Sequence, residues 1–278
     1  MRQPVLAAAI GLALAAATAG TAFAWQSARG QSAAAPRLTL AQAIAAPHRS
    51  PENRARDRYR HPAQTLGFFG VKPTDTVVEI WPAGGWYTEI LAPYLAARGT
   101  YYGASPAGRG AERFAQFVAI KPDLYGRVRT ATFPVLAAGG TSVPAGSADV
   151  VLTFRNVHNW MMGDAPFADQ AFRQMYAMLK PGGTLGIVEH RLPERADAQR
   201  ERTSGYVKTS TVRRLAEGAG FRYAGASEVN ANARDTADWP EGVWTLPPVL
   251  RLKDQDRAKY LAIGESDRMT LKFVKPRR

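Results

Sequence analysis

The 278-residue sequence contains no cysteine and only four histidines. Without cysteine the chain has no disulfide bond, no cysteine-ligated metal and no lipid anchor on a lipobox cysteine. Acidic residues are also few: 23 Asp and Glu stand against 36 Lys and Arg, which gives a formal net charge of +13. Such a charge favours contact with anionic partners. The basic residues are scattered, however, and no nucleic-acid-binding signature accompanies them, so we expect no nucleic-acid partner.

The first 24 residues have the layout of a secretory signal peptide. Arg2 gives a positive start, residues 5–19 form a nearly unbroken apolar run, and Ala-Phe-Ala at 22–24 is a signal-peptidase pattern in front of Trp25. The apolar run is too short and too rich in alanine for a typical membrane span, although an uncleaved N-terminal anchor is the alternative. We therefore expect a periplasmic or secreted protein with no integral membrane span after cleavage.

The rest of the chain is predicted to be a flexible leader over residues 25–47 and a single domain over residues 48–278. The domain begins with a helical extension. Its first helix covers residues 51–60, with Ser50 as the N-cap, and a shorter helix covers residues 62–69. Four arginines of the first helix are the densest basic cluster of the chain and are predicted to form a solvated surface. They are Arg54, Arg56, Arg58 and Arg60.

From residue 76 onward, short β-rich runs alternate with amphipathic helical runs, which predicts a parallel sheet with helices on both faces. The link between the last two runs, residues 230–264, is long and irregular, which suits an antiparallel final strand. The predicted fold is therefore α/β: a Rossmann-like, seven-stranded, mostly parallel sheet with an antiparallel last strand. The predicted strands are 76–80, 99–104, 128–133, 148–154, 184–189, 221–229 and 269–274, and the main helices are 87–97, 111–120, 166–179 and 209–219.

Several motifs lie where such a sheet binds ligands. The loop EIWPAGG at 79–85 joins the first strand to a helix, a place where glycine lets the backbone pass close to a cofactor. Asp149 opens the fourth strand, and LKPGG at 179–183 introduces the fifth. In this order and spacing the motifs resemble class I S-adenosylmethionine (SAM)-dependent methyltransferases, over residues 62–274. The Trp-Pro-x-Gly-Gly loop, with EHR at 189–191 and ESDR at 265–268, is also similar to a group of exported methyltransferase-like proteins.

The resemblance implies SAM as the cofactor, held by the first loop and by polar residues at neighbouring strand ends. Trp81 and Ala83 stand where the family has glycine. Ser105 ends the second strand, where the family has an acidic residue that binds the ribose, and a serine hydroxyl is a weaker, uncharged acceptor. The candidate cofactor-binding residues are Glu79, Trp81, Ala83, Gly84, Gly85, Ser105 and Asn156.

Two of the four histidines follow the fourth and fifth predicted strands, which are neighbours in the family's strand order. His158 and His190 are therefore candidate catalytic bases, because histidine accepts a proton near neutral pH. The alternative for His158 is a purely structural hydrogen bond. With Glu189 the two histidines also suggest a metal site, but no tight ligand spacing is present and we expect no metal. The candidate substrate-binding residues are Arg155, Arg191, Tyr206 and Trp244.

The insertion at residues 230–264 is rich in acidic, aromatic and proline residues. In the expected topology it lies on the ligand side of the sheet, where a long loop is either a lid over the site or a surface excursion with one helix.

The sequence thus predicts an exported SAM-dependent methyltransferase that acts on an unidentified small-molecule or lipid-linked acceptor. Two alternatives stay open. One is a binding or accessory protein that kept the methyltransferase fold and lost transfer activity. The other is a different envelope enzyme that uses the histidines on the same scaffold. The sequence leaves the oligomeric state open.

Overall fold

The computed structural model describes residues 35–136 and 142–277. The predicted signal peptide, residues 1–24, and the first part of the predicted leader, residues 25–34, lie outside this described part. Among the described residues, no helix has both the length and the apolar character needed to cross a membrane.

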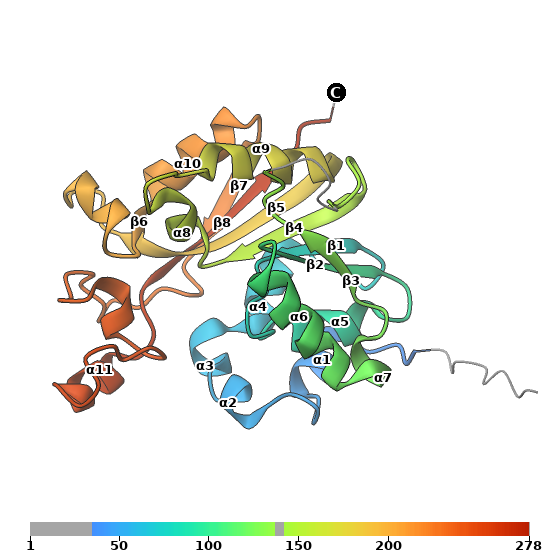
Figure 1. Ribbon diagram of the computed structural model, residues 1–278, viewed down its shortest axis with the longest axis horizontal. Coiled ribbons are helices and arrows are strands. Elements are labelled where there is room, and N and C mark those ends of the chain that lie inside the picture. The colour runs from blue at the N-terminus through green and yellow to red at the C-terminus, as the bar shows by residue number, and fades with distance from the viewer. Residues whose placement is uncertain (1–34, 137–141, 278) are drawn as a thin grey trace, which may run out of the picture. The chain divides into compact units, whose positions relative to one another are not determined.

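The described residues form one eight-stranded sheet (Figure 1). The strands are β1 Thr76–Ile80, β2 Thr100–Ser105, β3 Arg129–Thr132, β4 Ala148–Phe154, β5 Leu179–Leu192, β6 Val207–Lys208, β7 Arg222–Ser227 and β8 Arg268–Val274. Their order is β3-β2-β1-β4-β5-β8-β7, with the short β6 paired to β5. Strands β1 to β5 are parallel, and β8 is antiparallel to both β5 and β7. The predicted Rossmann-like fold is confirmed, and β6 adds an eighth strand.

Helices cover both faces of this sheet (Figure 1). They are α1 Leu40–Ala45, α2 Pro51–Arg54, α3 Asp57–Arg60, α4 Pro62–Phe69, α5 Thr88–Leu95, α6 Arg109–Ile120, α7 Pro122–Tyr125, α8 Val157–Met161, α9 Ala168–Met178, α10 Thr209–Gly218 and α11 Arg257–Ile263, with 3-10 turns η1 Ala198–Arg202 and η2 Gly242–Thr245. Alternate residues of β1 serve the two faces. Val78 and Ile80 pack with α8, α9 and α10, whereas Val77 packs with α1, α4, α5 and α6.

The leader prediction is wrong for residues 40–45, which form α1. Thr39 and Gln42 make a reciprocal capping box at its start, and Ala43 is fully buried against the domain. The two-way cap satisfies amides that a short helix would otherwise leave free, and burial supplies the stabilisation that six residues alone lack.

The predicted helix over residues 51–60 is two short helices, α2 and α3, with a turn between them. Arg56 precedes α3 without a side-chain cap, and His61 at the end of α3 has a left-handed φ of 42°. Pro62 then starts α4, as predicted, and Gly70 ends it at φ 77°. The double break turns the chain so that Arg60, at the end of α3, lies buried at the edge of the sheet.

The fifth strand, predicted over residues 184–189, begins earlier in the structure, and residues 181–183 form a bulge inside β5. Leu179 pairs with Ala148 and Thr184 pairs with Val150, so β5 has extra residues opposite β4 at this point. The strand continues to Leu192 and carries the Glu189-His190 segment past the end of β4. Helix α8, which was not predicted, begins directly after β4 and brings its first amides to that segment.

The insertion at residues 230–264 is tied to the start of β8 by buried polar groups. Asp235 accepts hydrogen bonds from the Trp239 indole at 2.7 Å and from the Asp267 amide at 2.7 Å. Asn232 donates its side-chain amide to the backbone of Ile263 at 2.9 Å. These bonds hold the two ends of the insertion together, and its middle, around η2, covers part of the site described below.

Candidate functional site

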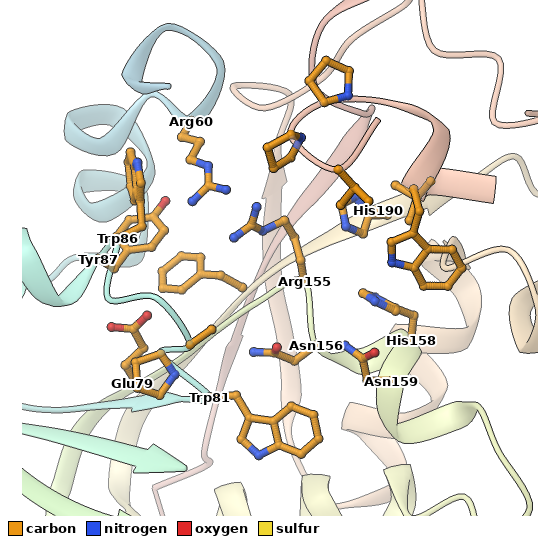
Figure 2. Close-up of a pocket in the computed structure, with 18 residues that line it drawn as sticks. Arg60, Glu79, Trp81, Trp86, Tyr87, Arg155, Asn156, His158, Asn159 and His190 are labelled. Atoms are coloured by element: carbon orange, nitrogen blue, oxygen red, sulfur yellow. The ribbon is translucent and has the colours of Figure 1, made fainter. Parts of the chain in front are cut away.

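A cavity of about 300 Å³ lies at the carboxyl ends of β1, β4 and β5 (Figure 2). Parallel α/β sheets bind ligands at this edge, and the volume is at the small end of the range for ligand pockets. Its wall comes from the loop after β1, the segment after β4, the end of β5, the end of α3 and the 230–264 insertion. The residues that matter most are Glu79, Trp81, Arg155, His158, His190 and Trp244.

Glu189 and His158 form a buried acid–base pair. The Glu189 carboxylate is 0% exposed. Its Oε2 accepts from the amides of Val157 and His158 at 2.6 and 3.3 Å, and its Oε1 lies 2.9 Å from His158 Nδ1. An ionised carboxylate only accepts hydrogen bonds, so Nδ1 carries the hydrogen and Nε2 is left to accept a proton. The structural bond considered as the alternative for His158 is therefore also what orients the candidate base.

His190 lines the cavity beside His158, with 5.3 Å between the ring centres. Its Nδ1 lies 2.5 Å from the Ser266 hydroxyl oxygen, which leaves Nε2 as the nitrogen available to a ligand. Burial, then the neighbouring His158 and Arg155, lower the pKa of His190 well below its usual range. His190 is therefore neutral at physiological pH, where Nε2 can accept a hydrogen bond from a bound molecule, and its surroundings disfavour protonation.

His158, Glu189 and His190 also offer ligand atoms that lie within 4.8 Å of one another, a spacing that a metal ion can use. The donor set argues against that use. Both Glu189 oxygens already accept backbone and ring N–H groups, and guanidinium groups close by oppose a further cation. The chemistry of the cluster favours proton transfer.

Arg155 and Arg60 bring positive charge to the same cavity. Arg155 follows β4 with a left-handed φ of 62°, a strained conformation that places its side chain in the cavity. Burial is the main cause that lowers the pKa of Arg155 to about 10. Arg60 is only 3% exposed, so the prediction that it belongs to a solvated surface is wrong. Its guanidinium lies 4.7 Å from the Trp86 ring centre.

The carboxylate of Glu265 pairs with several arginines at this end of the cavity. Glu265 lies 2.6 Å from Arg56, 3.3 Å from Arg60 and 2.8 Å from Arg268. Although burial raises the pKa of Glu265, the surrounding arginines outweigh it and bring that pKa down to about 2. In the sequence, the ESDR segment at 265–268 was the signal for this cluster, because it supplies both Glu265 and Arg268.

Glu79 lies at the other side of the cavity, at the end of β1. The Tyr101 hydroxyl donates to its Oε2 at 2.5 Å, and the side chain is 3% exposed. Burial raises the pKa of Glu79 to about 7, against the opposing effects of the Tyr101 hydrogen bond and of Arg155. Around neutral pH this carboxyl group is therefore divided between its charged and neutral forms.

The raised pKa of Glu79 predicts a pH-dependent stability. Between pH 4.5 and 7 the folded state keeps a proton that the unfolded state releases, so the free energy of unfolding falls as pH rises through this window. The fall in the free energy of unfolding across this window is up to about 3 kcal/mol, at about 1.4 kcal/mol for each unit by which the pKa is raised. We expect Glu79→Gln to remove this pH dependence. In urea denaturation, the free energy of unfolding of the variant should therefore rise relative to that of the parent as pH increases from 5 to 7.5. The exposed control Glu112→Gln should run parallel to the parent, and a parallel Glu79→Gln would contradict the shift.

The loop after β1 keeps a glycine-like path without the glycines. Trp81 and Ala83 have φ values of 53° and 48°, in the region that glycine favours. The Trp81 indole donates to the Phe133 carbonyl at 2.8 Å and packs on Trp160, so most of it fills core rather than cavity. Asn156 donates its amide to the Ile80 carbonyl at 2.9 Å and joins the ends of β4 and β1.

Three predicted cofactor residues lie outside the cavity wall. Gly84 is exposed and does not line it. Gly85 lies beneath the Phe117 ring, where a Cβ atom would come within 2.3 Å, so its role is close helix packing. Ser105 is buried at the end of β2, and its hydroxyl does not reach the cavity. The turn into α5 thus carries Gly84 and Gly85 away from the cavity, although Ala83 beside them lines it, and α6 packs against Gly85.

Two predicted substrate residues also lie elsewhere. Arg191 pairs with Asp267 at 2.8 Å and with Glu228 at 2.8 Å, and these bonds raise its pKa. Tyr206 is fully buried and donates to Asp235 at 3.0 Å, which fastens the insertion. Both act on the structure around the site and do not line the cavity.

Trp244, by contrast, lies in the cavity wall. It comes from η2 in the insertion, and its ring centre lies 6.1 Å from that of His158. Val243 and residues 247–249 line the cavity beside it, which favours the lid alternative over a surface excursion.

Comparisons with solved structures identify the same fold elsewhere. A SAM-dependent methyltransferase from Aquifex aeolicus is 15% identical with a TM-score of 0.52, over 86% of this chain and 99% of that one. An arsenic(III) SAM methyltransferase from Chlamydomonas reinhardtii is 15% identical with a TM-score of 0.51, over 87% and 75%. The [4+2]-cyclase SpnF is 14% identical with a TM-score of 0.55, over 79% and 81%.

No protein-family model matches this sequence, and no curated protein does. At such identities the structural likeness shows the methyltransferase fold alone. The cyclase illustrates the point, because a fold hosts more than one reaction and the function has to be argued from the site.

Proposed function

We propose that this chain is a SAM-dependent methyltransferase whose acceptor binds beside His158 and His190. The observation that carries the proposal is that one cavity joins the loop after β1 to the oriented His158–Glu189 pair. In the fold that the chain shares with methyltransferases, the first of these elements is a cofactor loop and the second stands where an acceptor would lie.

The residues present fit the cofactor at this loop. The positive φ angles of Trp81 and Ala83 keep the backbone open toward the cavity, as glycine would. Glu79, Trp81, Ala83 and Asn156 would hold SAM, since all four line the cavity. When bound, SAM supplies an electrophilic methyl group.

The chain's own chemistry is proton removal from the acceptor. Glu189 holds the Nδ1–H of His158, so that Nε2 faces a proton donor as a base. A positioned base of this kind contributes about 10²- to 10⁴-fold to a rate. His190, kept neutral by its surroundings, is available to accept a hydrogen bond from the same acceptor.

The test is isothermal titration of the chain from Trp25 onward with SAM and with S-adenosylhomocysteine. We expect both to bind, more weakly by about tenfold or more than at a site with an acidic ribose ligand, because Ser105 is outside the cavity. His158→Gln should bind SAM as the parent does, since it removes the base and no cofactor contact. Absence of binding at millimolar SAM would sink the proposal.

A second candidate is a binding or accessory protein that kept the fold and lost transfer. The position of Ser105 and the bulky Trp81 favour it. In that case the parent does not bind SAM, and Trp81→Gly creates binding. Tight binding by the parent excludes this candidate.

We also propose that the protein acts in the periplasm or outside the cell, on a small-molecule or lipid-linked acceptor. Export is supported by residues 1–24 and by the similarity to exported methyltransferase-like proteins. Because SAM is made in the cytosol, such an enzyme needs a supply in its compartment. N-terminal sequencing of the exported protein, with Trp25 expected first, tests the location.

A further inference from the structure

Two guanidinium groups from distant parts of the chain face each other in the cavity wall. Figure 2 shows Arg60, from the end of α3, and Arg155, from the segment after β4, with their guanidinium groups turned toward one another. Within the described residues the Arg155 side chain makes no hydrogen bond or ion pair. The Arg60 side chain has one bond, of 3.3 Å, to Glu265. Most of their donors are therefore left for a ligand.

Among the described residues, the only ion pair of these two arginines joins Arg60 to Glu265. That carboxylate is shared by Arg56 and Arg268 as well as Arg60, and the other carboxyl group at the cavity, Glu79, is only partly ionised at neutral pH. Three guanidinium groups thus share one carboxylate, and Arg155 beside them has no ion pair in the part of the chain that the structure describes. Arg60 is 3% exposed and Arg155 is half-buried, and partly dehydrated guanidinium groups of this kind are stabilised when an anion pairs with them.

We infer that Arg60 and Arg155 form a binding site for an oxyanion, a carboxylate or phosphate group of the acceptor. The planar forks of two guanidinium groups match the two or more oxygens of such a group and bind them with charge-assisted hydrogen bonds. The inference rests on the proposed function for its reaction, since it names the class of acceptor, whereas the anion site itself stands on the cavity geometry.

The position of the pair assigns the oxyanion to the acceptor. In Figure 2 Arg60 and Arg155 lie with His190 on one side of the cavity, and Glu79 and Trp81 of the cofactor loop lie on the other. His158, the proposed base, lies next to His190, with 5.3 Å between the ring centres. The oxyanion would therefore anchor the acceptor next to the base, with its reacting atom between the histidines and the cofactor loop. The other source of the same chemistry is the carboxylate of SAM itself.

The experiment uses the chain from Trp25 onward and titrates it with inorganic phosphate and with succinate. We expect one of these probes to bind the parent and Arg155→Gln to weaken it at least about tenfold. Arg155→Lys, which keeps the charge and loses the fork, should fall between them. Arg213→Gln is the matched control, because it removes one exposed guanidinium of α10 outside the cavity. Binding by the control should stay within about twofold of the parent.

Arg60→Gln is the second arm, and it is expected to weaken the same probe. Since Arg60 also contacts Glu265, a failure of this variant to fold leaves Arg155→Gln as the deciding measurement. Failure of both probes to bind the parent, or equal binding by Arg155→Gln and the control, overturns the anion site.

The source of the oxyanion is decided by titrating SAM and 5′-methylthioadenosine, which lacks the carboxylate. If Arg155→Gln weakens SAM but not 5′-methylthioadenosine, the pair holds the cofactor's carboxylate and the acceptor assignment is overturned. If Arg155→Gln binds SAM as Arg213→Gln does and has lost the probe, the assignment is supported. A parent that binds phosphate or succinate but not SAM supports the anion site while the proposed methyl transfer fails.

Discussion

We expect Glu189→Gln to lower the free energy of unfolding by about 2–6 kcal/mol, because it leaves two buried N–H groups without an acceptor at about 1–3 kcal/mol each. The carboxylate is fully buried and accepts from four N–H groups: the amides of Val157, His158 and His190, and the His158 ring. Glutamine keeps the shape but turns one oxygen into an NH₂ donor. Two of the four N–H groups then face a donor: either the first two amides of α8, or the His158 ring and the His190 amide.

Urea denaturation of the parent and the variant measures this loss. The control is Glu194→Gln, whose exposed carboxylate accepts from the amide and hydroxyl of Ser210 at the start of α10. We expect the control to lose no more than about 1 kcal/mol. The ring ¹⁵N shifts of His158 should also move away from the Nδ1–H tautomer in Glu189→Gln, a change that loss of packing alone would not give. A loss below about 1 kcal/mol would show that Glu189 does not hold α8 and the base together.

The order of strands and helices was predictable because its signals are local. The β-rich run before the EIWPAGG loop and the amphipathic run of α9 each report on their own burial through neighbours in sequence. Where local signals mislead, contacts between residues far apart in the sequence determine the structure. The Pro-Gly-Gly at residues 181–183 has the composition of a turn, yet pairing with β4 and β8 carries it as a bulge within a strand.

The site was predictable to the extent that strand ends meet. His158 and His190 follow β4 and β5, and the parallel pairing of those strands brings the rings together. Arg60 could not be placed in this way, because its partner Glu265 is 205 residues away. The cluster of Arg54, Arg56, Arg58 and Arg60 has the composition of a solvated basic surface, and only the break after α2 turns the last of them inward.

The misplaced site residues share a physical cause. Arg191 lies near the end of β5 and Tyr206 directly before β6, close to where ligands bind, but Arg191 pairs with Asp267 just before β8 and Tyr206 donates to Asp235 of the insertion. A buried arginine or tyrosine hydroxyl that finds a carboxylate is no longer available to a ligand. Arg155 differs because no carboxylate lies within ion-pair distance of it among the described residues. The charge left without a partner therefore distinguishes a binding arginine from a structural one in this fold.

Glu265→Gln is expected to cost about 3 kcal/mol of unfolding free energy at pH 7, because it leaves Arg56, Arg60 and Arg268 buried or half-buried without their common carboxylate. This stabilisation by Glu265 depends on pH. The folded pKa of about 2 is lower than the unfolded value of 4.5, so the stabilisation is present above pH 4.5 and is lost as pH falls toward 2. The difference between the parent and Glu265→Gln should therefore shrink in acid.

The control is Glu228→Gln, which also removes a carboxylate from an arginine but at an exposed pair with Arg191. Its cost should stay below about 1 kcal/mol, because water screens an exposed pair. If Glu265→Gln costs no more than this control, the three arginines do not depend on Glu265. If phosphate or succinate restores the stability of Glu265→Gln but not of Glu228→Gln, an external oxyanion takes the place of the lost carboxylate. We expect that rescue, because Arg60 both pairs with Glu265 and lines the cavity, so an oxyanion bound in the cavity can reach the same cluster of arginines.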